Sequence, residues 1–180
     1  SYFFRLSKWE KPLLDYYKNN PDFILPISRK NEVISFVEGG LKDLSISRKS
    51  FSWGIQVPGN NDHVIYVWLD ALTNYLSALN YPDTNDPLFK KFWPASVHLI
   101  GKDILRFHAV YWPAFLLAAK IPLPKKIYSH GWILSGSEKM SKSKGNILDP
   151  IEIINQYGLD PLRYYLIKEV SFGNDGNISQ

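Results

Sequence analysis

The sequence has no cysteine among its 180 residues. This absence excludes disulfides and thiolate zinc sites within the stretch, and nothing in it argues for an oxidising compartment. The four histidines, His63, His98, His108 and His130, lie far apart and lack the spacing of metal ligands. We therefore expect no metal site in this stretch. We place the protein in the cytoplasm, with an organellar matrix as the alternative.

Long apolar runs are also missing from the sequence. No segment approaches the ~20 residues of a membrane span, and no signal peptide is present, so we expect no membrane partner. Methionine is scarce as well, because Met140 is the only one and the chain begins at Ser1. These features lead us to expect a fragment of a longer protein.

The remaining composition is ordinary for a globular protein with a core, at 45% hydrophobic and 21% charged residues. The length is enough for one domain or parts of two. A formal net charge of +4 and a pI near 9.1 fit an anionic partner such as a nucleotide or a nucleic acid. Surplus lysines that serve only solubility would give the same totals.

Strand-like and helix-like segments alternate along the chain, which predicts an α/β fold with a parallel sheet. The predicted strands cover residues 44–47, 51–57, 63–68, 97–100 and 126–130. The first predicted helix is amphipathic, with Ser7 as a possible N-cap and Pro21 beyond its end. The other predicted helices cover residues 29–38, 70–79, 104–119 and 149–157, and another begins near 160. Pro113 should bend the helix at 104–119, and the tail from Phe172 is expected to fray.

Three segments follow predicted strands, namely residues 68–75, 101–108 and 130–145. Ligands of parallel sheets bind at the carboxyl ends of the strands, so we expect these segments to meet at one edge. Gly101 would allow a close backbone approach, and Asp103 could accept hydrogen bonds from ribose hydroxyls or merely cap a helix. His108 fits either a site or the core, and so do the aromatic residues around Trp68.

The loop at residues 135–146 carries Lys139, Lys142 and Lys144, which lie within six residues among serines and glycines. Lysine charges on flexible stems, together with hydroxyl and backbone donors, make a mobile clamp for an anion. No hydrophobic period runs through the loop, so core packing does not account for the lysines. A solvated basic turn is the alternative interpretation.

The string Lys139-Met140-Ser141-Lys142-Ser143 resembles the signature loop of class I aminoacyl-tRNA synthetases. Residues 66–75, 101–104, 106–108 and 111–114 resemble the methionyl-tRNA synthetases among them, and residues 2–7, 46–48 and 130–132 agree. The Val-Trp-x-Asp-Ala pattern at 67–71 separates this family from the isoleucine and valine enzymes, which usually carry Phe-Asp-Ser-Gly there. The resemblance covers the whole chain.

The resemblance implies the second half of a Rossmann-like class I catalytic domain with a parallel sheet, flanked by connective-insert and stem-contact helical segments. Residues 1–62 would end the connective insert and return to the catalytic domain. Residues 63–148 would form the second half of that domain with its lysine loop, and residues 149–180 would begin the helical stem-contact region.

The implied activity is that of a methionine–tRNA ligase, with L-methionine, ATP as its Mg²⁺ complex and tRNA(Met) as partners. Methionine and ATP would give methionyl-adenylate, and the acyl group would then pass to the tRNA. The His-Ile-Gly-His-like signature of class I enzymes is absent here, so we expect these 180 residues alone to be inactive. A leucine or cysteine enzyme of the same class and a non-catalytic nucleic-acid-binding module are the rival interpretations.

The resemblance also assigns roles to individual residues. Lys139 and Lys142 would be the catalytic cations at the phosphates, Lys142 being the stronger candidate, and Arg48 would be a weaker candidate for support of the amino-acid end. Many family members have proline at the position of Leu72. The residues that would line the methionine pocket are Trp68, Ala71, Leu72, Tyr75, Ile104 and His108. The residues that would contact ATP are Gly101, Lys102, Asp103, His130, Ile133, Lys139, Ser141 and Lys142.

Overall fold

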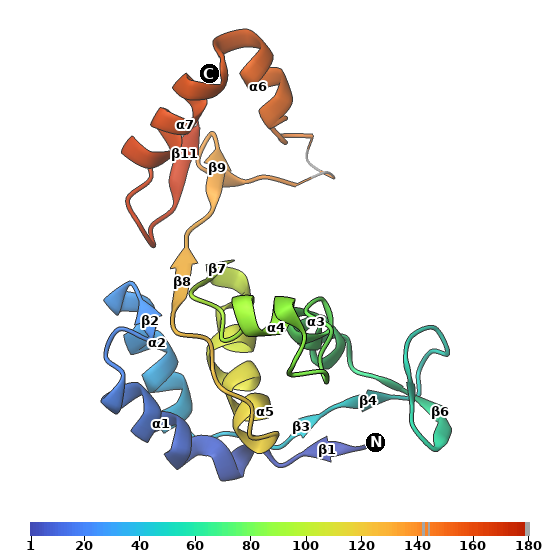
Figure 1. The fold of residues 1–180 in the computed structure, drawn as a ribbon. Coiled ribbons are helices and arrows are strands. Elements are labelled where there is room, and N and C mark those ends of the chain that lie inside the picture. Colours follow the sequence, from blue (N-terminus) through green and yellow to red (C-terminus); the bar gives the residue numbers. More distant parts are fainter. Residues whose placement is uncertain (142, 144, 179–180) are drawn as a thin grey trace.

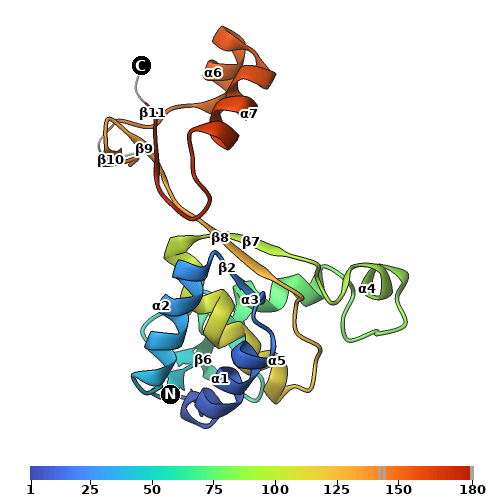
Figure 2. The ribbon, with the colours of Figure 1, turned by 90° about the vertical axis from the view of Figure 1, so that its left-hand side faces the viewer.

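A computed structural model describes residues 1–141, 143 and 145–178. The chain forms two parts, which we call the body (residues 1–131) and the C-terminal lobe (residues 132–178) (Figure 1). Strand β8 runs out of the body toward the lobe, and the view from a second direction shows the same separation (Figure 2).

A parallel sheet lies at the centre of the body. It contains β2 (Ile24–Leu25), β8 (Ile127–His130) and β7 (His98–Gly101), in the order β2-β8-β7, and both pairs are parallel. The predicted α/β fold with a parallel sheet is therefore confirmed. Strand β2 was not predicted, because two residues are too short to show a strand period.

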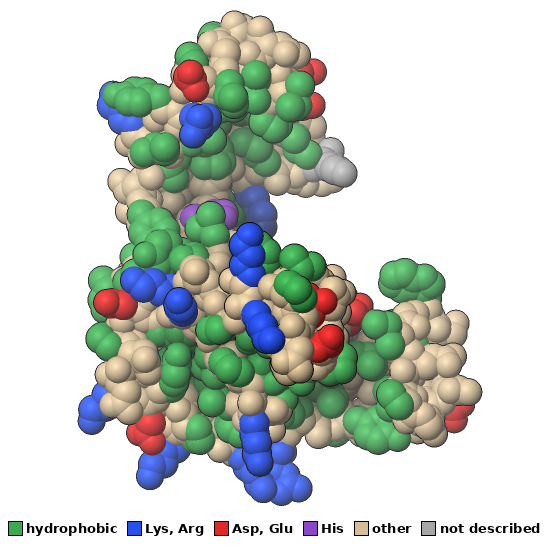
Figure 3. Space-filling view, viewed as in Figure 1, with side chains coloured by type: hydrophobic (Ala, Val, Ile, Leu, Met, Phe, Trp, Pro, Cys, Tyr) green, Lys and Arg blue, Asp and Glu red, His purple; other side chains and the backbone are tan. Residues whose placement is uncertain are grey.

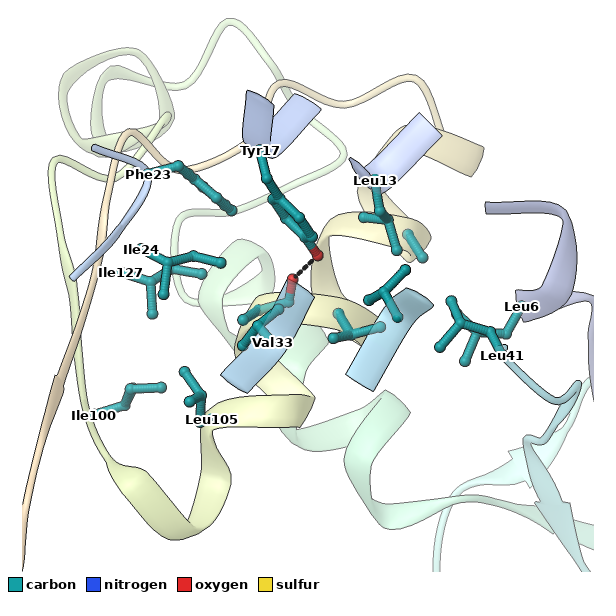
Figure 4. Close-up of a cluster of buried hydrophobic side chains, with 14 residues drawn as sticks. Leu6, Leu13, Tyr17, Phe23, Ile24, Val33, Leu41, Ile100, Leu105 and Ile127 are labelled. Carbon is teal, nitrogen blue, oxygen red and sulfur yellow. Dashed lines mark hydrogen bonds between the residues drawn. The ribbon is translucent and has the colours of Figure 1, made fainter. Parts of the chain in front are cut away.

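Helices α1 (Glu10–Asn19) and α2 (Ile27–Glu38) pack against this sheet, and the short 3-10 turn Leu6–Trp9 leads into α1. Their buried side chains share one core with residues from β7, β8 and the segment after β7 (Figure 4). Burying one large apolar side chain contributes about 1.5–3 kcal/mol, so a core of this size stabilises the body as one unit. The core is continuous across residue 62, and the division of the chain there stays a prediction. The members of this core are Leu6, Leu13, Tyr17, Phe23, Ile24, Val33, Val37, Leu41, Ile100, Leu105, Ala109, Val110, Ala114 and Ile127.

The helix predicted over residues 104–119 is present, but it is not one regular α-helix. Helical structure runs without a break from a 3-10 turn (Lys102–Ile104) through a π-helical stretch (Phe107–Tyr111) into helix α5 (Trp112–Ala118). Pro113 has no N–H, so it cannot donate to the carbonyl of Ala109 as a residue four positions on normally would. The hydroxyl of Tyr17, on α1, donates to that carbonyl instead (Figure 4). A proline effect was expected here, and it takes the form of this change of helix type.

Helices α3 (Val67–Ser77) and α4 (Pro87–Phe92) cover a second cluster of buried residues. This cluster joins them to α5, so α3 is fixed against the segment that follows β7. Its buried members are Leu72, Leu76, Phe89, Trp93, Trp112 and Leu116.

The strand predicted at residues 63–68 is β6 (Asn60–Ile65), and it does not belong to the parallel sheet. It pairs antiparallel with β4 (Ser47–Arg48) and with β5 (Gln56–Val57). Gly59, with φ of 76°, provides the turn that folds β5 back on β6. Residues 68–75 lie in α3, which follows β6, so the expectation that they follow a strand of the parallel sheet is wrong. A further antiparallel pair joins β1 (Phe3–Phe4) to β3 (Leu44–Ser45).

The C-terminal lobe contains β9 (Ile133–Ser135), β10 (Glu138–Lys139), α6 (Pro150–Tyr157), α7 (Leu159–Lys168) and β11 (Gly176–Ile178). The tail was expected to fray, but β11 pairs parallel with β9, which corrects that expectation. Gly131 makes the close approach possible, because a Cβ there would lie 2.0 Å from the carbonyl oxygen of Asn174. Helix α6 begins as predicted, with Asp149 accepting from the N–H of Ile151 at 2.8 Å.

Among the helices that the structure describes, none combines the length and the apolar character needed to cross a membrane.

The contact at Gly131 generates a stability prediction. Gly131→Ala should force residues 172–178 away from β9 and destabilise the folded state by about 1–3 kcal/mol, because the new Cβ meets backbone rather than a flexible side chain. Hydrogen exchange of the full-length protein should then show faster exchange of the Gly176 amide, which donates to the carbonyl of Trp132 at 2.8 Å.

The matched control is Gly39→Ala, where a Cβ would meet nothing closer than 3.4 Å. It should leave the exchange of residues 172–178 unchanged. Unaltered protection of these amides in Gly131→Ala would contradict the importance of the contact.

Candidate active site

The carboxyl ends of β7 and β8 form one rim of the sheet. Gly101 pairs with His130 across the two strands, and Lys102 and Asp103 follow directly in the 3-10 turn. A Cβ on Gly101 would come within 2.6 Å of Asp103 Oδ1, so the carboxylate folds back over the glycine. The structure thus brings four predicted nucleotide contacts to one rim. The side chain of Asp103 makes no capping hydrogen bond, so a capping role is not what the structure shows.

Trp132, which lies between β8 and β9, connects these groups. Its Nε1 donates to Asp103 Oδ1 at 3.3 Å, and its backbone N–H donates to Asp175 Oδ1 at 2.8 Å. The Nζ atoms of Lys102 and Lys139 lie 4.2 and 4.0 Å from the centroid of its ring. Lys102 Nζ also lies 2.7 Å from the carboxylate of Asp175. The Lys102 ammonium and the Trp132 N–H hold the pKa of Asp175 below its ordinary value.

The lysine loop begins as a hairpin. Strands β9 and β10 are joined by Gly136 and Ser137, whose φ angles are 59° and 68°. Positive φ at both central residues is the geometry of a two-residue hairpin turn that suits twisted strands. Asn146 returns to the hairpin, because its Oδ1 accepts from the N–H of Ser141 at 2.8 Å and its Nδ2 donates to the carbonyl of Lys139 at 3.3 Å.

The predicted loop residues are placed only in part. Lys139 and Ser141 are described, and the half-buried Ile133 opens β9 and pairs with Gly176. Lys142 and Lys144 lie outside the described residues, so the role predicted for Lys142 stays a prediction. The surface is hollowed between the body and the C-terminal lobe, and basic side chains lie at this hollow (Figure 3).

Beside the rim lies an aromatic cluster contributed by α3 and the π-helical stretch. Trp68 stacks on Phe107 with a centroid separation of 3.8 Å, and its ring lies 6.2 Å from that of His108. The hydroxyl of Tyr75 and Nε2 of His108 are 2.8 Å apart. The structure therefore brings Trp68, Tyr75 and His108 together. They were expected to meet because each would follow a strand of one sheet, but they meet because α3 packs against the π-helical stretch.

The remaining residues of the predicted methionine pocket lie differently from one another. Leu72 is fully buried in the second core cluster, and Ala71 on the same helix is exposed. Arg48 donates to the carbonyls of Ser45 and Ser47 and lies over the ring of Tyr66, 4.4 Å from its centroid. These contacts fix Arg48 near β4, and its predicted support of the amino-acid end stays a prediction.

The hydrogen bonds of His108 assign its protonation. Its Nδ1 lies 3.0 Å from the carbonyl oxygen of Ile104, which can only accept, so Nδ1 carries the proton. Nε2 of the neutral ring then accepts from the hydroxyl of Tyr75. Burial lowers the pKa of His108 below its ordinary value, with the Ile104 hydrogen bond opposing that shift. His108 is thus a buried, satisfied histidine and also one wall of the aromatic cluster.

A second buried histidine supports this pair. His98 is 5% exposed, its Nε2 accepts from Trp112 Nε1 at 3.3 Å, and its ring lies 4.3 Å from that of Tyr75. Burial, together with the neighbouring His108, lowers the pKa of His98 to about 4. The cluster therefore carries no histidine charge at neutral pH, which suits an uncharged side chain.

One short segment, residues 101–108, belongs to both parts of the site. Asp103 is bonded to Trp132 on the rim, and the carbonyl of Ile104 is bonded to His108 in the aromatic cluster. Two cavities bordered by described residues lie elsewhere. One, of about 320 Å³, is bordered by α6 and α7, and the other, of about 440 Å³, lies between α3 and α5.

Comparison with known proteins shows which family the chain belongs to. A family model described as tRNA synthetases class I (M) matches residues 1–180. The chain belongs to this family. It is 63% identical over 180 residues to a methionine–tRNA ligase of Rickettsia bellii, covering 100% of this chain and 35% of that relative. It is 62% identical over 179 residues to one of Brucella suis, covering 99% of this chain and 35% of that relative.

Solved structures of the same class I family show the same fold. The Mycobacterium tuberculosis methionyl-tRNA synthetase bound by methionyl-adenylate has a TM-score of 0.94 and 59% identity, covering 100% of this chain and 35% of that one. Its apo form has a TM-score of 0.89 and 55% identity, covering 99% and 34%. This class I chain spans about a third of the length of the curated relatives that it matches.

Several residues of this candidate site were missed by the prediction. Trp132 was part of the resemblance but received no role, and His98 was noticed only as part of a strand. Asp175 lies in a tail that was expected to fray, so its contact with Lys102 had no signal in the sequence. Asn146 follows the signature loop directly, and this adjacency was the one available hint.

Within the described ranges, no group of three or more histidine, aspartate or glutamate side chains is placed to hold a metal ion.

The buried His98 generates a pH prediction. Its pKa is about 4 when folded and about 6.5 when unfolded, so the unfolded state takes up the proton first as the pH falls. Stability should therefore be lost between pH 6.5 and 4, at about 1.4 kcal/mol per pH unit from this group.

Urea unfolding of the full-length protein at pH 7, 6 and 5 checks this dependence. His98→Gln should lose stability less steeply than the wild type below pH 6.5, and the two slopes should coincide between pH 7 and 8. Parallel slopes at all pH values would show that His98 is not the group responsible.

Proposed function

We propose that the full-length protein containing this chain is a methionine–tRNA ligase. The observation that carries the proposal is that residues 101–108 join a neutral aromatic cluster to a cationic rim. An uncharged, polarizable thioether suits the first of these, and a triphosphate suits the second. The identity of the chain with methionine–tRNA ligases supports the same assignment.

In the proposed reaction, the carboxylate of L-methionine attacks the α-phosphorus of ATP. Pyrophosphate leaves and methionyl-adenylate forms, and a ribose hydroxyl at the 3′ end of tRNA(Met) then attacks the acyl carbon and releases AMP. ATP enters as its Mg²⁺ complex. The contribution of the protein is to position the reactants and to stabilise the charge that develops.

The proposed roles follow the two parts of the site. Trp68, Tyr75 and His108 contact the methionine side chain, with Ala71, Leu72 and Ile104 completing the wall. Gly101, Lys102, Asp103, His130, Ile133 and Ser141 hold the nucleotide. Lys139 and Lys142 act as the catalytic cations at the phosphates.

The proposal also divides the chain by role. Residues 1–62 complete the connective insert and return to the catalytic domain, residues 63–148 form its second half, and residues 149–180 begin the stem-contact region. The working place of the enzyme is the cytoplasm or an organellar matrix.

The decisive experiment is amino-acid-dependent exchange of pyrophosphate into ATP by the full-length protein. Methionine should support exchange, whereas leucine and cysteine, the substrates of the rival class I assignments, should not. A protein that binds tRNA in a salt-dependent manner but supports no exchange would instead favour the non-catalytic binding module.

Lys142→Ala in the full-length protein should slow adenylate formation by about tenfold to a thousandfold, because a cation at the developing charge is removed. The dissociation constant for methionine should change by less than about twofold, because methionine lies in the other part of the site. Exchange at the wild-type rate would count against a catalytic role of Lys142.

The isolated 180 residues should make no adenylate. The chain spans only 35% of each ligase that it matches, and the rest of the ATP site is proposed to lie in the remainder. Single-turnover formation of methionyl-adenylate measures this, with the full-length protein as the positive control. Adenylate synthesis by the isolated chain would overturn the expectation.

A further inference from the structure

Trp132 makes more contacts within the site than any role assigned to it explains. Its backbone N–H binds Asp175, its Nε1 binds Asp103, and its ring receives the ammonium groups of Lys102 and Lys139. These partners come from three places in the chain, namely the turn after β7, strand β10 and the segment before β11. Three of them are residues for which we propose contact with ATP.

We propose that Trp132 is a positioning residue that holds Lys139 over its indole ring, beside Lys102 and Asp103, and so presets the cationic side of the ATP site. The inference rests on the proposed function. It goes beyond it by assigning a role in the ATP-dependent step to a residue that need not touch ATP.

A ring and a carboxylate act differently on the charge of a lysine partner. A carboxylate neutralises an ammonium group and competes with phosphate for it, as Asp175 does at Lys102. An aromatic face attracts the ammonium through its quadrupole and leaves the full charge in place. Lys139 Nζ lies 4.0 Å from the centroid of the Trp132 ring, well within the ~6 Å range of such contacts.

Restricting Lys139 before ATP arrives favours binding of the phosphates. A long lysine side chain on an exposed hairpin otherwise samples many rotamers, and ordering it would oppose binding. Lys102 and Lys139 are bound to one ring, so their charges lie within the ~8–10 Å over which charges interact in physiological salt. A polyphosphate that binds beside this ring is attracted by both charges, and at Lys102 it competes with Asp175.

The same indole also orients the acceptor beside the lysines. Asp103 Oδ1 would clash with any Cβ at Gly101, and the hydrogen bond from Trp132 Nε1 keeps the carboxylate in that folded position. Ring and Nε1 therefore serve different partners, and substitutions can separate them. Phenylalanine keeps a ring face and lacks the N–H, whereas leucine lacks both.

The test compares Trp132→Phe with Trp132→Leu in the full-length protein. Both variants are made in two backgrounds, one that keeps Lys139 and one that carries Lys139→Ala. Both substitutions remove Nε1–H, so the difference between them reports the ring. ATP affinity is measured by equilibrium dialysis without methionine, and methionine-dependent pyrophosphate exchange gives kcat and the two KM values. Trp132→Leu should weaken ATP binding by roughly three- to thirtyfold, the size of a cation–π contact, and Trp132→Phe should restore part of it.

In the Lys139→Ala background, the Phe and Leu variants should agree within about twofold, because the ring has lost the lysine that it positions. The KM for methionine should stay within about twofold of the wild type throughout. Phe92→Leu is the matched control, since Lys91 Nζ lies 5.1 Å from the Phe92 ring on α4, away from β9 (Figure 2). It should leave every constant unchanged.

An equal difference between Phe and Leu in both backgrounds would overturn the inference, and so would a rise in the KM for methionine that matches the loss of ATP affinity. Either result would make Trp132 a general packing residue. Absence of methionine-dependent exchange in the wild type is a separate failure, of the proposed function, because the dialysis arm still tests the role of the ring.

Discussion

The hydroxyl of Tyr17 and the carbonyl of Ala109 form the hydrogen bond on which the geometry of the site depends. Pro113 removes the donor that Ala109 would have in a regular helix, and an unsatisfied buried carbonyl costs about 1–3 kcal/mol. Tyr17 supplies the donor from α1, and burial raises its pKa, so it keeps its proton. The π-helical stretch around Ala109 is then tolerated, and this stretch is where His108 lies. Helix α1 thus supports a residue of the site although no part of α1 contributes a side chain to it.

The two parts of the site handle charge in opposite ways. In the aromatic cluster, burial keeps both histidines neutral. Both ring nitrogens of His108 are hydrogen-bonded, one to Tyr75 and the other to the carbonyl of Ile104. On the rim, two lysines remain cationic and share one exposed edge with Trp132. Residues 101–108 belong to both, so a displacement of this segment would alter them together. This shared segment is why the aromatic cluster and the cationic rim lie side by side.

Much of this could be predicted from the sequence, and the failures have physical causes. Strands β7 and β8 contain apolar residues in sequence and are bounded by turn residues, so their positions were clear, and short motifs identified the family. Strands β2 and β11 have two and three residues, too few for a period, and their pairing depends on residues about a hundred and about forty positions away. The role of Trp132 could not be derived either, because its partners Lys102, Lys139 and Asp175 converge only in the folded chain.

The close approach at Gly131 has a consequence for how this region can vary among related proteins. Trp132 and Asp175 are bonded, and β9 and β11 lie side by side, so the chain leaves the sheet after β10 and returns to the same place at β11. Closing such an excursion costs only slightly more entropy when it is lengthened. Extra residues between α6 and α7 would therefore enlarge the lobe without moving its base. Insertions and deletions should accumulate at that far tip, while the junction at Gly131 keeps a constant length.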